Sequence, residues 1–380
     1  QRQMCIRDSM EAMPVLQRFR AATASAGLLA VLSQALPLRA QLPGSVERLY
    51  QDQQLRDQLH NLRQQPTQPK PLIEGKPKSG HDQSAPGQEQ PAPGVQPQQA
   101  PPIKGVELEG ARLFPAARVK ELQQAFVGRP ASDANLAELQ ADVTEWYDHA
   151  KLLAYTGNPV LTADGVVRVP VVEARLGAVR VQENRSPIPS GWAIATILSS
   201  VGLNREFRLD KLESALLKLN DLGGVEARSS LRPGQASGTT DVVLTLKTAD
   251  QVQGVVGVNN HVVQYTGPYQ AEGSVSFLGL LGKGEIFNFN AGYSGNIDWY
   301  GSRRLAGTGS VPLTPDGLSW IGSYSLTDYR LLKDFVPDNY TGTGAIGTLG
   351  LSQILWRRPK KNITMNWIGE VDQFTDSVLG

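Results

Sequence analysis

Apolar and polar residues alternate with a period of two along residues 251–372, which predicts strands with one apolar and one polar face. The clearest segment is residues 285–293, where Phe287 and Phe289 fall on one side and Asn288 and Asn290 on the other. The other segments that show the pattern are residues 251–259, 272–278, 304–311, 318–327, 343–355 and 362–372. The sequence therefore predicts about seven strands.

The connections between these strands alternate in length. Residues 280–284, 312–317 and 357–361 are tight, whereas residues 295–302 and 329–342 are longer and polar or aromatic. In outer-membrane barrels, short turns face the periplasm and long loops face outside, with strands of about ten residues between them. A soluble β-sandwich would show the same alternation of residues along each strand, but its fold does not require short and long connections to alternate. The pattern favours a transmembrane β-barrel.

The composition excludes some classes of function. The chain has 380 residues, enough for several domains, and its net charge of +1 argues against a general nucleic-acid or polyanion binder. Residues 1–40 are predicted to be a leader made of non-native residues and a signal peptide, in which Arg18 and Arg20 precede the apolar residues 21–36. The single cysteine, Cys5, lies in this leader, so we expect no disulfide or thiol chemistry in the mature protein.

Residues 41–64 and 65–101 differ sharply in composition. The first segment is predicted to be a helix, because Leu55, Leu59 and Leu62 form a narrow apolar stripe among polar residues. The second is rich in Pro, Gln, Gly and Lys and has almost no large apolar residue. We expect it to remain an extended, disordered linker.

The region between the linker and the strands contains two units with similar order of elements, residues 102–174 and 175–248. Each is predicted to be a small α+β domain with helices over a sheet. The predicted elements of the first are a strand at Val106 and Leu108, helices 116–126 and 135–147, and strand 166–172. Those of the second are strand 176–181, helices 192–201 and 209–219, and strands 225–231 and 241–246.

Several short motifs occur at the end of the second unit and in the first strands. Residues 219–225 read Leu-Asn-Asp-Leu-Gly-Gly-Val, residues 231–234 read Leu-Arg-Pro-Gly, and residues 238–242 read Gly-Thr-Thr-Asp-Val. Residues 280–285 read Leu-Leu-Gly-Lys-Gly-Glu, and Ser-Tyr-Ser follows at residues 323–325. Together they resemble the polypeptide-transport-associated (POTRA) domains and first barrel strands of two-partner secretion transporters, the haemolysin-activator-like outer-membrane family.

This resemblance implies two α+β POTRA domains, residues 102–174 and 175–248, followed by the N-terminal part of a transmembrane antiparallel β-barrel, residues 249–380. It implies that the POTRA pair captures the N-terminal secretion domain of an unfolded exoprotein in the periplasm by adding a strand at a sheet edge. The exoprotein would cross the outer-membrane lipid through the barrel. The helix at residues 41–64 would occupy the lumen at rest. No ATP, metal or other cofactor is implied.

The chain departs from the family pattern in two places. The first POTRA domain of the family carries a Gly-Tyr pair after its long helix, where this chain reads His-Ala-Lys-Leu-Leu-Ala-Tyr at residues 149–155. Altered packing of the middle strand is expected there. The family's barrel also has more strands and a Val-Arg-Gly-Tyr type motif that this chain lacks, so we expect the chain to be a fragment of the full transporter.

Catalytic and metal-binding interpretations find little support. The histidines His60, His81, His149 and His261 have no metal-ligand spacing. Residues 282–284, Gly-Lys-Gly, lack the length of a phosphate loop and are better explained as a strand turn. The basic residues Arg357, Arg358, Lys360 and Lys361 surround Pro359 and are predicted to be solvated. We expect no enzyme.

Two alternatives remain. An outer-membrane protein assembly factor also joins POTRA domains to a barrel, although the N-terminal helix and proline-rich linker are not expected in it. A secreted β-rich adhesin or binding protein would need no POTRA domains and would be soluble without detergent.

Overall fold

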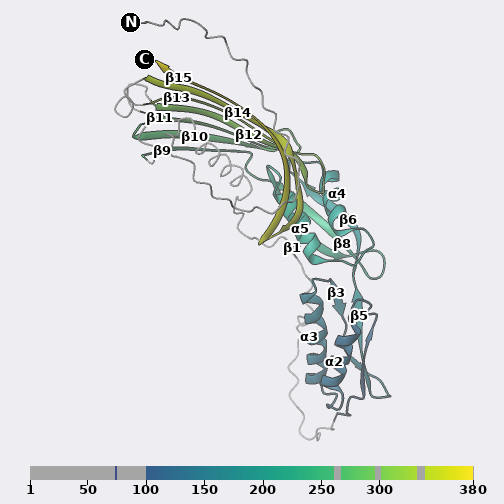
Figure 1. The fold of residues 1–380 in the computed structure, drawn as a ribbon. Coiled ribbons are helices and arrows are strands. Elements are labelled where there is room, and N and C mark those ends of the chain that lie inside the picture. The colour runs from purple at the N-terminus through teal and green to yellow at the C-terminus, as the bar shows by residue number, and fades with distance from the viewer. Residues whose placement is uncertain (1–72, 75–99, 261–266, 296–300, 332–338, 380) are drawn as a thin grey trace, which may run out of the picture.

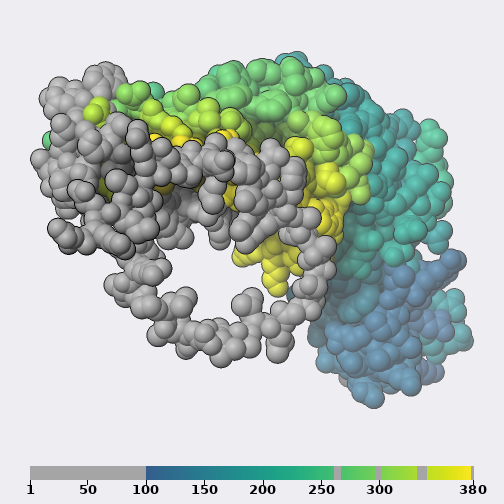
Figure 2. Space-filling model, turned by 45° about the horizontal axis from the view of Figure 1, so that its top comes forward, coloured from purple at the N-terminus to yellow at the C-terminus, as the bar shows by residue number. Residues whose placement is uncertain are grey.

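The computed structural model describes residues 73–74, 100–260, 267–295, 301–331 and 339–379. These residues form two α/β domains and a long curved sheet, arranged one after another in Figure 1. In Figure 2 the two domains, in blue and teal, project to one side of the green and yellow sheet. The predicted leader, the predicted N-terminal helix and nearly all of the linker lie outside the described residues, as do His60, His81 and His261.

The first α/β domain consists of β2 (Gly105–Glu109), α2 (Ala116–Phe126), α3 (Asp133–His149), β3 (Ala154–Thr156), β4 (Val160–Leu161) and β5 (Val166–Glu173). β5 pairs in parallel with β2 and antiparallel with β3 and β4. Apolar side chains of the helices and of β5 form the core, in which Leu139, Val143 and Val167 are fully buried. The predicted helices and strands are present, while the short β3 and β4 had no signal in the sequence.

The second α/β domain consists of β6 (Arg175–Asn184), α4 (Ser190–Val201), α5 (Leu209–Asn220), β7 (Val225–Pro233) and β8 (Thr239–Thr248). β8 lies between β7 and β6, antiparallel to the first and parallel to the second. The spacing of the leucines predicts one apolar face of α5, formed by Leu209, Leu212, Leu216 and Leu219. The last three are fully buried, and Leu209 is partly buried against the same core.

The linker contributes a strand that the sequence does not predict. Two of its residues form β1 (Ile73–Glu74), which pairs in parallel with Ser229 and Ser230 of β7. The prediction of a disordered linker is wrong at these residues, because adding a strand to a sheet edge uses backbone N–H and C=O groups and needs no apolar side chain. The sheet order of the domain is β1-β7-β8-β6.

Residues 149–155, between α3 and β3 of the first domain, contact the second α/β domain. Lys151 has a φ of 57°, in the left-handed region that glycine adopts most easily. The middle strand nevertheless forms, because β3 pairs with β5 directly after this turn. Leu153 is buried in the core of the second domain, and its amide donates to the carbonyl of Phe207 at 2.8 Å. The two domains thus share core packing and backbone hydrogen bonds.

All seven predicted strands are present and form one antiparallel sheet in chain order. They are β9 (Val252–Asn259), β10 (Tyr269–Leu278), β11 (Ile286–Gly295), β12 (Gly301–Pro312), β13 (Leu318–Arg330), β14 (Asn339–Arg358) and β15 (Lys361–Leu379). The last two contain 20 and 19 residues, well beyond the predicted lengths.

One face of this sheet carries polar side chains that bond across the strands. The hydroxyl of Ser276 donates to the side-chain oxygen of Asn288, whose amide donates to the hydroxyl of Thr308. Farther along, the hydroxyls of Ser323 and Thr348 lie 2.7 Å apart. Because the register places these residues opposite one another, the polar face continues from β10 to β14.

Burial across the sheet is the reverse of that in a soluble β protein. On β13, Ser325 and Thr327 are 4% and 5% exposed, whereas Tyr324 and Leu326 are 55% and 44% exposed. A soluble β-sandwich would instead bury its apolar face in a core. Apolar side chains that are exposed on successive strands are expected where the sheet faces lipid. The sheet therefore agrees with the predicted barrel and not with the sandwich.

Glycines make room for the aromatic rings of the apolar face. Phe289 lies opposite Gly307, and a Cβ at that glycine would be 3.3 Å from the ring. Phe287 lies opposite Gly309, where a Cβ would be 3.0 Å from the ring. The rings of Phe277 and Phe289 pack with centroids 6.1 Å apart. Rings that cover neighbouring glycines compensate for the weak strand preference of glycine.

Candidate functional site

Three short turns of the sheet lie against the second α/β domain. They are residues 279–285 between β10 and β11, residues 313–317 between β12 and β13, and residues 359–360 between β14 and β15. Each turn, or the end of a strand next to the turn, forms hydrogen bonds with α5 or with residues 221–224, the loop that follows α5. These are the three connections that the sequence predicts to be tight and to share one end of the barrel. The structure brings that end onto the second domain.

A close backbone contact joins the loop after α5 to the first turn. The amide of Gly223 donates to the carbonyl of Gly284 at 2.9 Å. A Cβ at Gly223 would lie 2.2 Å from the carbonyl oxygen of Glu285, and one at Gly279 would lie 2.3 Å from that of Gly223. Gly279 also has a φ of 70°. Neither position tolerates a side chain, which explains Gly223 in the Leu-Asn-Asp-Leu-Gly-Gly-Val motif.

The carboxylate of Glu285 organises the first turn. Glu285 is 1% exposed and accepts hydrogen bonds from the amides of Leu281 and Lys283. The amide of Gly279 donates to the Glu285 carbonyl at 2.8 Å and closes the turn. Because backbone donors offset the cost of burying the carboxylate, the turn is held ready for the contact with the loop. The Gly-Lys-Gly segment therefore belongs to a strand turn, as the sequence predicts.

A bidentate ion pair joins the third turn to the C-terminal end of α5. Nε and Nη2 of Arg357 donate to the two carboxylate oxygens of Asp221 at 2.6 and 2.7 Å. Nη1 of the same guanidinium donates to the carbonyl of Arg358 and to the side chain of Asn362. Only 16% of the Arg357 side chain is exposed. The planar guanidinium is thus held in one orientation, because each of its three nitrogens donates a hydrogen bond.

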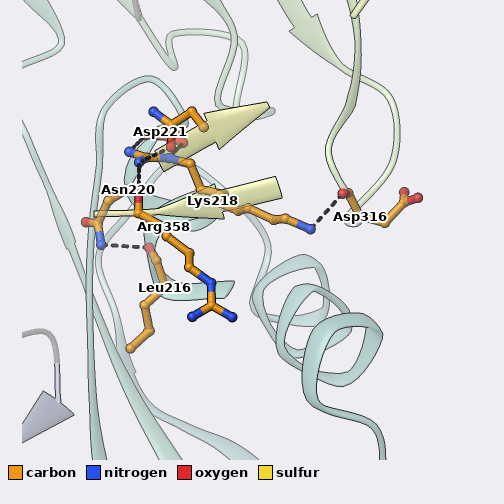
Figure 3. A network of polar contacts seen from close by, with 8 residues as sticks. Leu216, Lys218, Asn220, Asp221, Asp316 and Arg358 are labelled. Carbon is orange, nitrogen blue, oxygen red and sulfur yellow. Dashed lines mark hydrogen bonds and ion pairs between the residues drawn. The ribbon is translucent and has the colours of Figure 1, made fainter. Parts of the chain in front are cut away.

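Asn220 fixes the helix end that carries Asp221. Its side-chain amide donates to the carbonyls of Leu216 and Ala227 at 2.8 and 3.0 Å, and its oxygen accepts from the amide of Ala227 at 2.8 Å. Figure 3 shows the hydrogen bond from Asn220 to Leu216. Because these bonds tie the end of α5 to β7, the carboxylate of Asp221 has a defined position relative to the sheet of the domain.

The neighbouring Arg358 contacts the opposite end of α5. Its Nη2 donates at 2.6 Å to Asp210, which lies in the first helical turn and also accepts from Nε of Arg208 at 3.1 Å. Burial raises the pKa of the Asp210 carboxyl, but the hydrogen bonds and charges of Arg208 and Arg358 outweigh it, so this pKa lies below its ordinary value. The carboxylate is also favoured by the helix N-terminus.

Lys218 on α5 contacts the second turn. Its Nζ donates to the carbonyl of Asp316 at 2.9 Å, as Figure 3 shows. Burial lowers the pKa of Lys218, and the carboxylate of Asp316 partly opposes this shift. With Asp221 directed to the third turn and the following loop against the first, α5 and its loop contact all three short turns.

The basic residues around Pro359 are not uniformly solvated, contrary to the prediction. Lys360 and Lys361 are exposed, but Arg357 and Arg358 form the ion pairs described above. Their carboxylate partners lie 136 and 148 positions away in the sequence, so no local spacing reveals them. The only available signal was the acidic residue within the Leu-Asn-Asp-Leu-Gly-Gly-Val motif.

Other candidate chemistry is sparse in the part of the chain that the structure describes. There, no group of three or more His, Cys, Asp or Glu side chains is placed to hold a metal ion. His149 is exposed and its Nε2 lies 3.3 Å from the carboxylate of Glu145 on the same helix. Among α2 to α5, no helix combines the length and apolar character needed to cross a membrane. The arrangement at α5 is a joint that holds two bodies in a defined orientation.

Two helix-over-sheet domains that lead directly into an antiparallel sheet with an apolar outer face define a POTRA-containing outer-membrane protein. A family profile described as "POTRA domain, ShlB-type" matches residues 101–174. A second profile, "Haemolysin secretion/activation protein ShlB/FhaC/HecB", matches residues 238–373. The chain belongs to this family of two-partner secretion transporters.

One relative is similar in sequence, and two solved structures are similar in fold. The heme/hemopexin transporter protein HuxB of Haemophilus influenzae is 25% identical over 193 residues, which cover 47% of this chain and 34% of HuxB. CdiB from Escherichia coli shares the fold with a TM-score of 0.58 at 22% identity, over 90% of this chain and 61% of CdiB. CdiB from Acinetobacter baumannii shares the fold with a TM-score of 0.55 at 15% identity. The chain thus spans about a third of HuxB and less than two thirds of either CdiB.

The family also defines where the parts of the chain lie. Its members are outer-membrane β-barrel proteins with POTRA domains in the periplasm, and this chain has the same location. The two α/β domains are therefore periplasmic. Because the short turns rest on the second domain, they form the periplasmic end of the sheet.

Proposed function

We propose that this protein captures an unfolded exoprotein in the periplasm through its POTRA domains and exports it through a β-barrel pore to the cell surface. The observation that carries the proposal is the position of the second POTRA domain. Its helix α5 and the following loop contact all three short turns of the sheet. A polypeptide held by this domain is therefore next to the periplasmic mouth of the barrel to which β9–β15 belong.

The edge of β7 supports capture by strand addition. β1 pairs there in parallel with Ser229 and Ser230, so the backbone geometry of this edge accepts an added strand. Main-chain hydrogen bonds made in this way are tolerant of sequence, which suits an unfolded partner. We take the β7 edge as the position where a strand of the secretion domain of the exoprotein adds.

The polar face of the sheet supports passage of an unfolded chain. Uncharged side chains hydrogen-bond in pairs across the strands, Asn288 with Thr308 and Ser323 with Thr348. Hydroxyl and amide groups of this kind keep a lumen hydrated, which favours the passage of an unfolded polypeptide. Export then needs no ATP or metal, and folding of the exoprotein outside the cell supplies the direction.

The test is export by the full-length protein expressed with the exoprotein encoded beside it. Exoprotein should appear in the medium with the wild type and stay in the periplasm when residues 101–174 are deleted. Heat-modifiable migration on cold gels shows whether the barrel of the deletion variant is folded. Undiminished export by the folded variant would contradict the proposed role of the first POTRA domain.

The same strain distinguishes export from assembly of other outer-membrane proteins. Depletion of a transporter should leave the folded porins of the outer membrane at normal levels, whereas depletion of an assembly factor should lower them. Loss of porins together with normal exoprotein export would reject the proposed function in favour of the assembly factor.

A further inference from the structure

The hairpin of β14 and β15 continues beyond the rest of the sheet. β14 pairs with β13 only from Thr341 to Gln353, whereas its pairing with β15 continues to Arg358. A strand needs about ten residues to cross a bilayer, so strands of 20 and 19 residues project past the short-turn end. We call residues 354–364 the hairpin extension. It lies along α5 and carries Arg357 and Arg358.

The two arginines hold α5 at both ends. Arg357 pairs with Asp221 directly after the helix, and Arg358 pairs with Asp210 in its first turn. The guanidinium of Arg358 also lies 5.0 Å from the ring centroid of Trp356 in the same extension. Since the contacts lie about three helical turns apart, they resist tilting of the helix in a way that one contact does not.

The N-terminal end of α5 also contacts the first POTRA domain. The amide of Leu209 donates to the carbonyl of Lys151 at 2.8 Å, and Leu152 forms a β-bridge with Arg208. Arg208 in turn shares Asp210 with Arg358. The two POTRA domains are thus joined to each other by backbone bonds and core packing, whereas the extension is joined to them by side-chain ion pairs.

The contact between Gly223, Gly279 and Gly284 is of a different kind. It is a backbone contact with no side chain to reorient, and it lies beside the covalent connection from β8 to β9, where the amide of Ala249 donates to the carbonyl of Gly224 at 3.0 Å. We call this contact the glycine pivot. Opening the ion pairs on α5 leaves the pivot and the covalent connection in place.

We propose that the hairpin extension and α5 form a latch that fixes the two POTRA domains, as one body, at a single angle to the barrel. When the latch opens, the two domains swing together about the glycine pivot. This inference rests on the proposed function, since the angle between receptor domains and pore matters to a protein that passes a polypeptide from one to the other.

Spin-label distances in the full-length protein, with Cys5→Ser and in lipid nanodiscs, test the latch. One label pair joins Lys120 on α2 to Leu305 on β12, and the second joins Lys120 to Ser199 on α4, all exposed positions. Arg357→Asp should broaden the first distance distribution several-fold in width and leave the second unchanged. Arg358→Asp should do the same.

The double variant Asp221→Arg/Arg357→Asp restores opposite charges and should return the first distribution to the width of the wild type. Arg168→Asp is the matched control, because it breaks an exposed pair with Glu107 at 3.1 Å inside the first domain. It should change neither distribution. If single variants yield no heat-modifiable barrel, Arg357→Gln and Arg358→Gln remove the pairs without placing like charges together.

An unchanged first distribution in the single variants, or a charge swap as broad as Arg357→Asp, would overturn the latch. Broadening of the second distribution would overturn the movement of the two domains as one body. None of these distances depends on an exoprotein, so loss of the proposed function is measured separately by export. A latch that opens as expected in a protein that exports nothing refutes the export proposal alone.

Discussion

Arg357 and Asp221 are 136 positions apart in the sequence and form a two-point ion pair with N–O distances of 2.6 and 2.7 Å. Arg357 is the next-to-last residue of β14 in the outer-membrane sheet, and Asp221 follows the helix α5 of a periplasmic domain. The pair therefore joins the part of the chain that meets lipid to the part that we propose meets the exoprotein. The predictions below test the two bodies and the contacts between them.

The two faces of β11 should respond differently to a charge. In the full-length protein, Phe289→Arg places a cation on the lipid face and should cost roughly 2 to 4 kcal/mol near mid-bilayer, whereas Asn288→Arg faces the lumen and should cost much less. Heat-modifiable migration on cold gels measures the folded fraction. Phe289→Arg should lose most of it, and Asn288→Arg should fold and alter the current through the channel. Equal folding of the two variants would contradict the assignment of faces.

Chemical labelling should identify the medium outside the barrel. A single cysteine in place of Phe289, which is 50% exposed, should resist a water-soluble maleimide and react with a lipid-dissolved one. A cysteine in place of Asn288 should react with the aqueous reagent from the lumen. Aqueous labelling at position 289, or protection of both positions from both reagents, rejects the membrane assignment.

Adding one methyl group at the glycine pivot should weaken the joint. Gly223→Ala places a Cβ 2.2 Å from the carbonyl oxygen of Glu285, which forces the loop and the turn apart. We expect a cost of about 1 to 3 kcal/mol, typical of overpacking, seen as faster proteolysis between the domains and the barrel. Gly191→Ala is the control, because a Cβ added there would have no atom within 4 Å apart from its chain neighbours and the backbone of its own helix. The proposed contact is wrong if both variants resist protease equally.

Neutralising Asp210 should destabilise the POTRA domains at neutral pH. Because its pKa is lowered in the folded protein, the carboxylate contributes stability above the ordinary Asp pKa, and this contribution is lost as pH falls through the lowered value. Asp210→Asn should therefore cost about 1 to 3 kcal/mol at pH 7, and the difference from the wild type should shrink only below about pH 4.

The helical circular-dichroism signal in urea measures this effect, since the helices in the described part of the chain, α2 to α5, all lie in the two POTRA domains. Asp164→Asn, at an exposed turn of the first domain, serves as the control and should leave the urea midpoint unchanged. A difference between Asp210→Asn and the wild type that grows at acidic pH has the wrong sign for a lowered pKa.

The β7 edge should be adjacent to captured exoprotein. A photo-crosslinking amino acid in place of Ser230 on β7 should crosslink to the secretion domain of the exoprotein, whereas one in place of Arg180 on β6 should not. Both residues lie in the same sheet, on opposite edge strands of the domain itself. Crosslinking at position 180 alone would move the capture site to the other edge.

Local pattern was enough to predict most of the elements. The alternation around Phe287 and Phe289 identifies a strand whatever surrounds it, because the period of two is a property of extended backbone. The leucine spacing at residues 212–219 identifies one buried face of α5 in the same way. β1 was not predictable, because its pairing with β7 uses backbone groups that every residue carries. The short β3 and β4, of three and two residues, give too few positions to show a period.

By itself, the sequence determined the strands, the POTRA-like units, the short turns and the family, because each depends on residues close together in the chain. Only the tertiary structure decided that Arg357 and Arg358 meet Asp221 and Asp210, and that Gly223 fits against Gly279. These contacts join segments more than fifty positions apart, and nothing in their local spacing distinguishes a paired charge from a solvated one. The sequence therefore does not predict the joint between the POTRA domains and the barrel. Folding determines which distant charged residues come together at a partly buried site, where their attraction is stronger than in water.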